Sequence, residues 1–471
     1  MSLWSAQEAA LATGGETAGD WQAEGVSIDT RTLQAGDLFV ALADQRDGHD
    51  FVAEALQKGA SAALVSRRPA DVLSDENLLY VQDVQAALEG LARAARQRSA
   101  AQVIAITGSA GKTSTKEMLR VMLQAQGKTH ASYASYNNHW GVPLTLASLP
   151  RDAAFAVVEI GMSNPGEIAP LARLVRPDAA LITTVAPAHL AAFENLEGIA
   201  REKAAIVQGL TAQGYAVLNA EAPCRSVMEQ AVAAKGCQSL WFGSGAAQAR
   251  ITQLSVKDGV MQVMTSIGDL SLKFELHTVG RHFAMNALGA LALLSKLNAD
   301  VEKAARVLAQ WQPAEGRGTR HQLHAPFGAV ELIDDAYNAN PISMQAALDV
   351  LAQATSSRRV AFLGDMKELG ADERAHHSAL AQLPAIRNID LIHTAGPLMA
   401  ALHHSLPVEK RGQHFANAKE MAACVEVLLQ ADDCILVKAS LSSGLRQVVD
   451  AIKIISQSDP DCAARPVERK R

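Results

Sequence analysis

The sequence predicts an α/β protein of three domains, in which helices cover sheets of mainly parallel strands. Short apolar runs alternate with helical stretches over most of the chain, and continuous apolar strands are typical of parallel sheets buried on both faces. The length of 471 residues exceeds one ordinary hydrophobic core. The alternation starts afresh near the EGRG segment at 315–318. We therefore predict a small N-terminal α/β domain, a central phosphate-loop ATPase domain and a C-terminal Rossmann-like domain.

The bulk composition indicates a soluble globular protein. The net charge of -6 gives no reason to expect nucleic acid or an anionic membrane as a partner. The N-terminus lacks the pattern of a signal peptide, and no apolar run approaches the roughly 18 residues that span a bilayer. The cysteines are scattered without a CxxC pair, which argues for a reducing compartment and against structural zinc: Cys224, Cys237, Cys424, Cys434 and Cys462. We expect a cytoplasmic monomer with no membrane insertion.

Residues 1–100 form the first predicted domain. A turn-rich segment at 29–51 surrounds a short strand at Leu38–Leu42, and an Ala-rich helix follows at Val84–Arg96. This part of the chain has the least regular pattern.

Residues 101–314 form the central predicted domain. Its expected strands are mostly apolar and short: Val103–Thr107, Phe155–Ile160, Ala179–Val185 and Tyr215–Asn219. A helix is predicted at 113–126, because Met118, Leu119, Met122 and Leu123 give it an apolar stripe. Gly127 stands where a C-terminal cap is expected.

Residues 315–457 form the third predicted domain, followed by a polar tail at 458–471. Its expected strands are Ala329–Asp334, Arg359–Gly364, Asp390–Gly396 and Cys434–Ala439. A helix should begin after Asn340, which can cap it, with Pro341 in its first turn. Its buried face is predicted from the helical spacing of Met344, Ala347, Leu348 and Leu351.

The stretch TGSAGKTS at 107–114 predicts a phosphate-binding loop. The common pattern G-x-x-x-x-G-K-[ST] would need a glycine at Ile106, and the nearest glycine comes two positions later. A strand nevertheless leads in and a helix leads out, so that backbone N–H groups and the helix N-terminus can hold an anion. A strand-to-helix turn with a surface lysine is the less favoured alternative. The predicted nucleotide-binding residues are Gly108, Ser109, Ala110, Gly111, Lys112, Thr113 and Ser114.

The short loop resembles the T-G-[ST]-x-G-K-[ST] loop of the ATP-dependent Mur ligases and of folylpolyglutamate synthase. Other motifs similar to this family follow in order: EIGMSNPGEI (159–168), TTVAPAHL (183–190), REKAAI (201–206), VGRHFAMNAL (279–288), EGRG (315–318), DDAYNANPISM (334–344) and LGDMKELG (363–370). The resemblance to the Mur ligase family covers nearly the whole chain. DDAYNANP and GDMKELG are similar to the members that add D-alanyl-D-alanine to a UDP-N-acetylmuramoyl-tripeptide.

The resemblance implies an ATP-dependent amide ligase of peptidoglycan synthesis that makes the UDP-muramoyl-pentapeptide. Such an enzyme converts a carboxylate into an acyl phosphate, which an amine then attacks. Three negatively charged groups must approach one another, so fixed cations and metal ions are required. ATP and Mg²⁺, two ions by resemblance, are therefore the expected cofactors.

Five residues are the expected catalytic and metal-binding set. Lys112 would neutralise the β- and γ-phosphates, and the Thr113 hydroxyl would hold Mg²⁺. Glu159 ends a strand at the carboxyl edge of the sheet, where a carboxylate suits Mg²⁺. By resemblance, His189 is a metal ligand and Lys203 carries a carbamate that binds a second Mg²⁺. From the sequence alone, the histidine and the lysine would be ordinary packed or surface residues.

The remaining nucleotide contacts are implied by resemblance alone. Asp335 is similar to the ribose-binding aspartate of the family, and His282 with Asn286 is similar to its adenine contacts. Arg317 is similar to an arginine that reaches the phosphates from the C-terminal domain. Closure of the domains over ATP would exclude water from the acyl phosphate.

Substrate contacts are expected in three places. The resemblance places the D-alanyl-D-alanine donor near Tyr337, Asn338 and Asn340, although Asn340 also fits an ordinary helix cap. The muramoyl-peptide is expected beside two neighbouring asparagines, Asn137 and Asn138. The uridine-nucleotide region is expected at Thr30 and Arg31, where a surface arginine is nearly as plausible.

Departures from the family pattern are few. Thr30 replaces a serine, Thr184 replaces an asparagine and Phe283 follows His282. A K-G-S-R stretch common in the family reads Lys-Ala-Ser-Leu at 438–441, so we assign no site role there. Other amide ligases of the same group, a nucleotide-driven switch and an inactive binding protein are the competing functions. DDAYNANP disfavours the first, and Glu159 without a switch motif disfavours the second.

Overall fold

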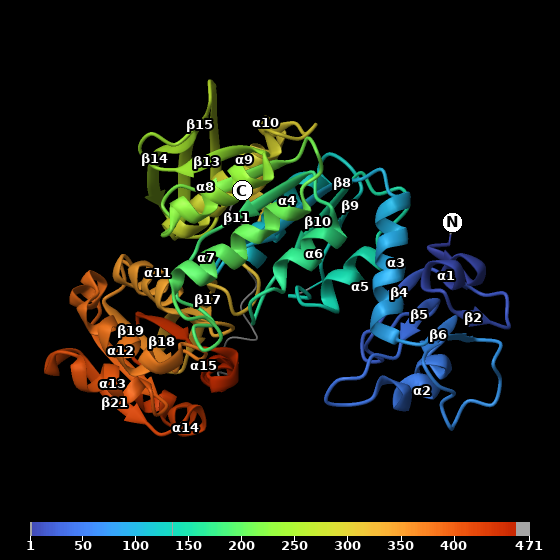
Figure 1. The fold of residues 1–471 in the computed structure, drawn as a ribbon. Coiled ribbons are helices and arrows are strands. Elements are labelled where there is room, and N and C mark those ends of the chain that lie inside the picture. The colour runs from blue at the N-terminus through green and yellow to red at the C-terminus, as the bar shows by residue number, and fades with distance from the viewer. Residues whose placement is uncertain (1, 134, 458–471) are drawn as a thin grey trace, which may run out of the picture.

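The computed structural model describes residues 2–133 and 135–457. The predicted polar tail at 458–471, with Cys462, lies outside the described residues. The chain folds into three α/β parts, with the N-terminal part in blue and the C-terminal part in orange and red on opposite sides of the central part (Figure 1). The predicted three-domain α/β architecture is confirmed. Within the described ranges, no helix is long and apolar enough to cross a membrane.

The N-terminal part contains a five-stranded sheet. Its order is β2 (Glu16–Thr17), β7 (Leu78–Tyr80), β6 (Ala62–Val65), β5 (Asp37–Val40) and β4 (Gly25–Ser27). Two further short strands, β1 (Trp4–Ser5) and β3 (Gln22–Ala23), pair with each other outside this sheet. Three helices surround the sheet: α1 (Ala6–Thr13), α2 (Val52–Gln57) and α3 (Val84–Arg98). The expected strand and helix are present. Trp4 Nε1 donates to Ala147 O at 2.9 Å, which attaches this part to the central one.

The central part is built on a nine-stranded sheet. Its order is β16 (Leu270–Leu276), β15 (Val260–Ile267), β14 (Ala249–Lys257), β13 (Gln238–Gly243), β12 (Tyr215–Asn219), β11 (Ala179–Ile182), β8 (Gln102–Thr107), β10 (Phe155–Glu159) and β9 (Thr129–Ala131). The strands from β14 to β9 are parallel, whereas β15 and β16 are antiparallel to their neighbours. The four strands predicted here are confirmed, and each ends within three residues of its predicted limit.

The hairpins at the edge of this sheet were not predicted. β14 and β15 are joined by Asp258 and Gly259, both with positive φ (51° and 75°). An Asp-Gly pair between alternating strands is a strong indicator of a tight hairpin. The sequence therefore carried the information for the hairpin.

Helices cover both faces of the central sheet. One face packs against α4 (Lys112–Gln124), α9 (Arg281–Leu294) and α10 (Val301–Val307). The other packs against α5 (Gly141–Ala147), α6 (Ile168–Val175), α7 (Leu196–Ala204) and α8 (Arg225–Lys235). The predicted apolar stripe of α4 is buried, but Gly127 is not its cap. The helix ends at Gln124 with Ala125 as its cap, and the Gly127 N–H donates to Leu123 O at 2.9 Å beyond that end.

The C-terminal part contains a six-stranded sheet. Its order is β17 (Thr319–Ala325), β18 (Gly328–Asp335), β22 (Asp433–Lys438), β19 (Arg358–Gly364), β20 (Leu391–Ala395) and β21 (Arg411–Phe415). All pairs are parallel except β17 with β18. One face packs against α11 (Pro341–Ala352) and α13 (Met399–Ser405), and the other against α14 (Ala418–Leu428) and α15 (Arg446–Gln457). The short α12 (Glu373–Ala379) follows β19.

The predicted start of α11 is confirmed. Asn340 Oδ1 accepts the Ser343 N–H at 2.9 Å, Pro341 is the first helical residue, and the predicted apolar positions are buried. Three segments of the C-terminal part contact the central part: Glu315–Gly318, 337–340 and 368–370. They approach the carboxyl ends of β8, β10 and β11, which is where ligands bind in sheets of this kind.

Candidate active site

The predicted phosphate loop connects β8 to α4. Gly108 has φ 151°, and a Cβ atom there would lie 1.9 Å from Thr183 Oγ1, so only glycine fits. Ser109 Oγ exchanges hydrogen bonds with the Ala186 backbone, donating to its O at 3.0 Å and accepting from its N at 2.9 Å. The first turn of α4 has no side-chain cap. Its N–H groups are therefore available to an anion.

Lys112 is the first residue of α4, where the loop ends. Its Nζ donates to Gly108 O at 2.8 Å. Burial lowers the pKa of Lys112, Glu159 opposes that shift, and the positive charge of Arg317 adds to it. Two cations from different domains thus face each other here, an arrangement that a polyanion would stabilise.

A carboxylate and a hydroxyl meet beside this lysine. Thr113 Oγ1 donates to Glu159 Oε2 at 3.0 Å, and Asn137 Nδ2 donates to Glu159 Oε1 at 2.7 Å. Glu159 is only 1% exposed. Oxygen donors of this kind suit Mg²⁺, so these residues fit the predicted ion. Among the described residues, however, no three His, Cys, Asp or Glu side chains form a ready metal cluster.

His189 and Lys203 lie near the same loop. His189 has a left-handed backbone (φ 60°), and its Nδ1 is 2.5 Å from Glu368 Oε2 of the C-terminal part. Lys203, in α7, is 1% exposed. Burial lowers the pKa of the Lys203 amine well below its usual value, and the charge of Lys112 adds to the shift. Burial therefore favours the uncharged, nucleophilic form of this amine.

A cavity of about 510 Å³ lies between the central and C-terminal parts. It brings together predicted residues from four segments: Ser109, Ala110, Gly111, Ser114, His282, Asn286, Arg317, Asp335, Asn338 and Asn340. Burial lowers the pKa of His282 to about 4, so its imidazole is neutral. Phe283, the departure from the family pattern, packs against this ring at an angle of 44°, with centroids 4.0 Å apart.

Lys438 also lines this cavity, although it was not among the predicted site residues. Its Nζ donates to Asp335 Oδ2 at 2.7 Å and to Asn338 O at 2.9 Å. Burial raises the pKa of Asp335, and the lysine partly offsets the shift. Our reading of 438–441 as lacking a site role is wrong for this residue. Its position at the end of β22, beside Asp335 of β18, was the available indication.

Arg317 and Tyr337 act as a pair at the domain boundary. The guanidinium lies over the tyrosine ring at 4.2 Å, and its Nη2 donates to Ser135 Oγ at 3.1 Å. Asn340 Nδ2 donates to Ser109 O at 3.2 Å while its oxygen caps α11. The DDAYNANP motif therefore contacts the phosphate loop directly. Asn340 both caps α11 and makes a contact between the two domains.

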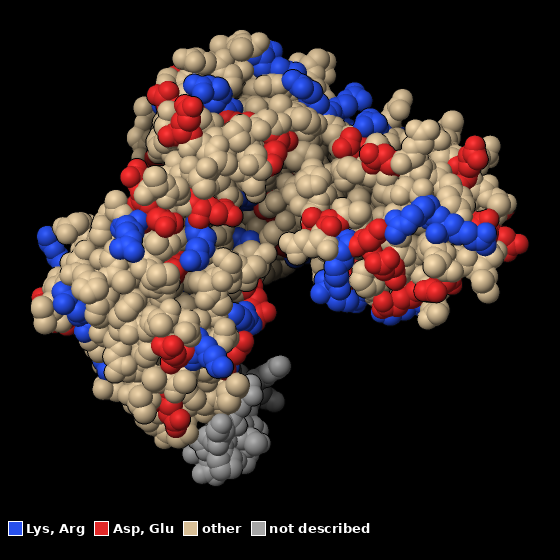
Figure 2. All heavy atoms as spheres, turned by 60° about the horizontal axis from the view of Figure 1, so that its bottom comes forward, with Lys and Arg blue, Asp and Glu red and all other residues tan. Residues whose placement is uncertain are grey.

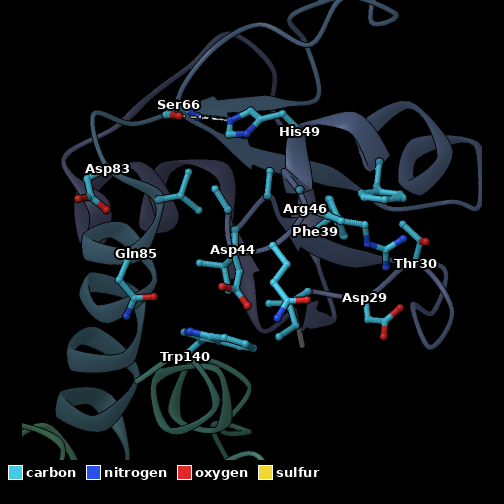
Figure 3. Close-up of a pocket in the computed structure, with 18 of the residues that line it drawn as sticks. Asp29, Thr30, Phe39, Asp44, Arg46, His49, Ser66, Asp83, Gln85 and Trp140 are labelled. Carbon is cyan, nitrogen blue, oxygen red and sulfur yellow. Dashed lines mark hydrogen bonds between the residues drawn. The ribbon is translucent and has the colours of Figure 1, made fainter. Parts of the chain in front are cut away.

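A second cavity, of about 980 Å³, lies mainly in the N-terminal part and contains Thr30 and Arg31. Trp140, from the central part, lies across it from His49 and Ser66 (Figure 3). Arg31 is 80% exposed and pairs with Asp29. Asn137 and Asn138 do not line this cavity. Asn138 accepts the Gly141 N–H at 2.9 Å and so shapes the start of α5.

Comparison with known proteins decides the family. Residues 22–96 match the Mur ligase family catalytic domain, residues 106–294 the Mur ligase middle domain, and residues 316–441 the Mur ligase glutamate ligase domain. The chain belongs to the Mur ligase family. The family resemblance read from the sequence is therefore confirmed.

Individual Mur ligases align with nearly the whole chain. The UDP-N-acetylmuramoyl-tripeptide–D-alanyl-D-alanine ligase of Escherichia coli K12 is 36% identical over 440 residues, covering 91% of this chain and 94% of the relative. The Bacillus subtilis enzyme of the same name is 34% identical, covering 90% and 92%. A crystal structure of MurF from Acinetobacter baumannii superposes with a TM-score of 0.84 at 29% identity, covering 96% and 99%.

Proposed function

We propose that this protein joins D-alanyl-D-alanine to a UDP-N-acetylmuramoyl-tripeptide at the expense of ATP, giving the UDP-muramoyl-pentapeptide used in peptidoglycan synthesis. The observation that carries this is the full-length similarity to ligases with that name. The cavity that joins the phosphate loop to the DDAYNANP motif supports the same reaction. Other Mur ligases and folylpolyglutamate synthase share the fold at 15–17% identity, which gives no reason to choose their substrates.

Activation of the substrate carboxylate is the first chemical step. The carboxylate attacks the γ-phosphate of ATP, giving an acyl phosphate and ADP. Lys112 and Arg317 face each other where the phosphates would lie, and the free N–H groups of α4 face the same place. These fixed positive groups would stabilise the charge that develops during transfer.

The amine of D-alanyl-D-alanine then attacks the acyl phosphate, and inorganic phosphate leaves. Tyr337 and Asn338 are the proposed donor contacts, because they lie beside Arg317 and the cavity. Contact of Asn340 with the loop holds the C-terminal part over the site. Water is thereby kept from the acyl phosphate.

Thr113 and Glu159 are proposed to hold one Mg²⁺. His189 and a carbamate on Lys203 are proposed to hold a second, because burial favours the uncharged Lys203 amine, which can react with CO₂ to give an anionic carbamate. When bound, the ions would neutralise phosphate oxygens. His282, Asn286 and Asp335 are proposed to bind the nucleoside, and Thr30 with Arg31 the uridine end of the substrate.

We propose domain boundaries near residues 100 and 315. The first falls between α3 and β8, and the second falls before β17. We also propose a cytoplasmic monomer; the four described cysteines are free, which suits a reducing compartment.

The test is product formation from defined substrates. Purified protein with ATP, Mg²⁺ and UDP-muramoyl-tripeptide should give pentapeptide and one ADP per product only when D-alanyl-D-alanine is present. Single amino acids such as diaminopimelate or glutamate, offered with their own UDP-muramoyl acceptors, should not be used. Preferential use of one of them would refute the proposed donor. Rapid ATP hydrolysis without any acceptor would favour the nucleotide switch.

A further inference from the structure

We propose that Glu368, in the C-terminal part, is a positioning residue that orients the His189 ring for metal binding. Because the two residues belong to different domains, metal binding by His189 would then depend on domain closure. The inference rests on the proposed function, in which His189 is a metal ligand. Glu368 was not among the predicted site residues, although its motif was recognised. The pair joins two domains through the 2.5 Å contact between His189 Nδ1 and Glu368 Oε2.

The side-chain pair is one of three contacts between the same short segments. Ala191 N donates to Glu368 O at 3.4 Å. A Cβ atom on Gly370 would lie 3.2 Å from the Leu190 carbonyl, which is a close backbone approach. The segments 189–191 and 368–370 therefore fit against each other along their main chains. This fixes where the Glu368 carboxylate can lie.

Both partners have a left-handed backbone. The φ angles are 60° at His189 and 66° at Glu368, a region that residues with a side chain rarely adopt. Such conformations persist when the surrounding structure determines them, and they are concentrated at functional sites. In this pair the unusual backbone turns each side chain toward the other domain.

Stability alone does not account for the pair. The Glu368 side chain is 60% exposed and that of His189 is 29% exposed. Exposed ion pairs contribute little to stability, because water screens them and the side chains lose freedom. Among the described residues, Glu368 is the one carboxylate that pairs with His189; the other charged groups acting on the ring are Lys112 and Lys203.

The chemistry of the ring gives the pair its role. A histidine that donates its Nδ1 proton to a carboxylate has only Nε2 left to bind a metal ion, with its lone pair free. Carboxylates placed in this way fix the tautomer and the direction of the ring. Because the carboxylate comes from the other domain, opening of the domains would release the ring.

The experiment compares three variants in complexes with a non-hydrolysable ATP analogue. Mn²⁺ binding is followed by electron paramagnetic resonance, without amine or turnover. Glu368→Ala should weaken Mn²⁺ binding by about tenfold or more, as is typical when the partner of a ligating histidine is lost. Glu368→Gln should cost less than about threefold, because its amide oxygen still accepts the Nδ1 proton. Glu426→Ala, an exposed glutamate of α14, should match wild type.

Turnover provides a second readout. Glu368→Ala should lower kcat and raise the Mg²⁺ requirement while the KM for D-alanyl-D-alanine stays constant. Mn²⁺ affinity equal in Glu368→Ala and Glu426→Ala would overturn the proposal, as would equal losses in the Ala and Gln variants. Because the Mn²⁺ titration contains no amine, failure of the proposed ligase reaction would be seen separately, in the wild-type product assay.

Discussion

Thr113 Oγ1 donates a 3.0 Å hydrogen bond to Glu159 Oε2, although the two residues are 46 positions apart. β8 and β10 are neighbours in the sheet, with Ile106 opposite Glu159. The loop that follows β8 therefore places the first turn of α4 beside the carboxyl end of β10. This brings a hydroxyl, a carboxylate and the Lys112 ammonium group to one edge of the sheet.

Lys112→Ala should reduce kcat by roughly 100-fold or more, because removing one preorganised electrostatic contact has effects of this size. The measurement is phosphate release coupled to pentapeptide formation. Lys128→Ala is the matched control, since Lys128 is exposed and pairs with Asp152 away from the loop. Equal rates in the two variants would remove Lys112 from the mechanism.

Gly108→Ala should weaken ADP binding by at least about tenfold, equivalent to about 1.4 kcal/mol. The new Cβ would lie 1.9 Å from Thr183 Oγ1, so the loop must move. Isothermal titration calorimetry provides the measurement. Gly245→Ala is the control, because it also has positive φ (64°) but has open space around it. If Gly108→Ala bound ADP as tightly as Gly245→Ala, the close packing of the loop on Thr183 would be unimportant.

Two variants should distinguish the two roles of Asn340, which are to cap α11 and to contact the phosphate loop. Asn340→Ala removes the cap of α11 and should cost about 1 kcal/mol of unfolding free energy. Asn340→Asp keeps the cap oxygen but removes the donor to Ser109 O and adds a negative charge near the phosphates. It should fold with near wild-type stability in urea denaturation, yet raise the KM for ATP several-fold. An unchanged KM would show that the contact has no catalytic role.

Lys203 should respond to carbon dioxide. Burial lowers its pKa well below the usual lysine value and so favours the uncharged amine, which is the form that reacts with CO₂ to give a carbamate. Activity should fall in CO₂-depleted buffer and return on adding bicarbonate. Labelled ¹³C-bicarbonate should give a carbamate signal in wild type that is absent from Lys203→Arg. A ¹³C signal of equal intensity in that variant would place the carbamate elsewhere.

His393 should make the C-terminal sheet sensitive to acid. Burial lowers its pKa from 6.5 to about 4, and the charge of Arg358 adds to the shift. The folded state therefore binds fewer protons than the unfolded one, so stability is complete above pH 6.5 and is lost as pH falls toward 4. Between about pH 7.5 and pH 5 the loss should be about 2 kcal/mol.

Hydrogen exchange of the β19 and β20 amides tests this, with β5 of the N-terminal part as internal reference. His393 Nδ1 accepts the Gln413 N–H at 3.0 Å, and Asn at this position can supply an acceptor. His393→Asn should flatten the pH dependence in β19 and β20. The same slope in variant and wild type would assign the effect to another group.

Local patterns in the sequence were sufficient for much of this protein. The apolar runs predicted the strands of the parallel sheets, and the Asn340-Pro341 pair predicted the start of α11. TGSAGKTS predicted the phosphate loop despite its unusual spacing. Each of these depends on interactions between residues close in the chain, where side-chain type and spacing limit the backbone directly. The resemblance to a family supplied His189 and Lys203, which pattern alone would not have selected.

Only the tertiary structure decided which residues join the site from other domains. Lys438 reaches Asp335 because β22 lies beside β18, and Ser135 receives Arg317 because the C-terminal part rests on the central one. Glu368 meets His189 across 179 positions of chain. Such contacts depend on strand order and domain packing, which no local spacing encodes. The sequence determined the chemical groups and the helix, strand or loop that holds each of them. The packing of three domains determined which groups face one another.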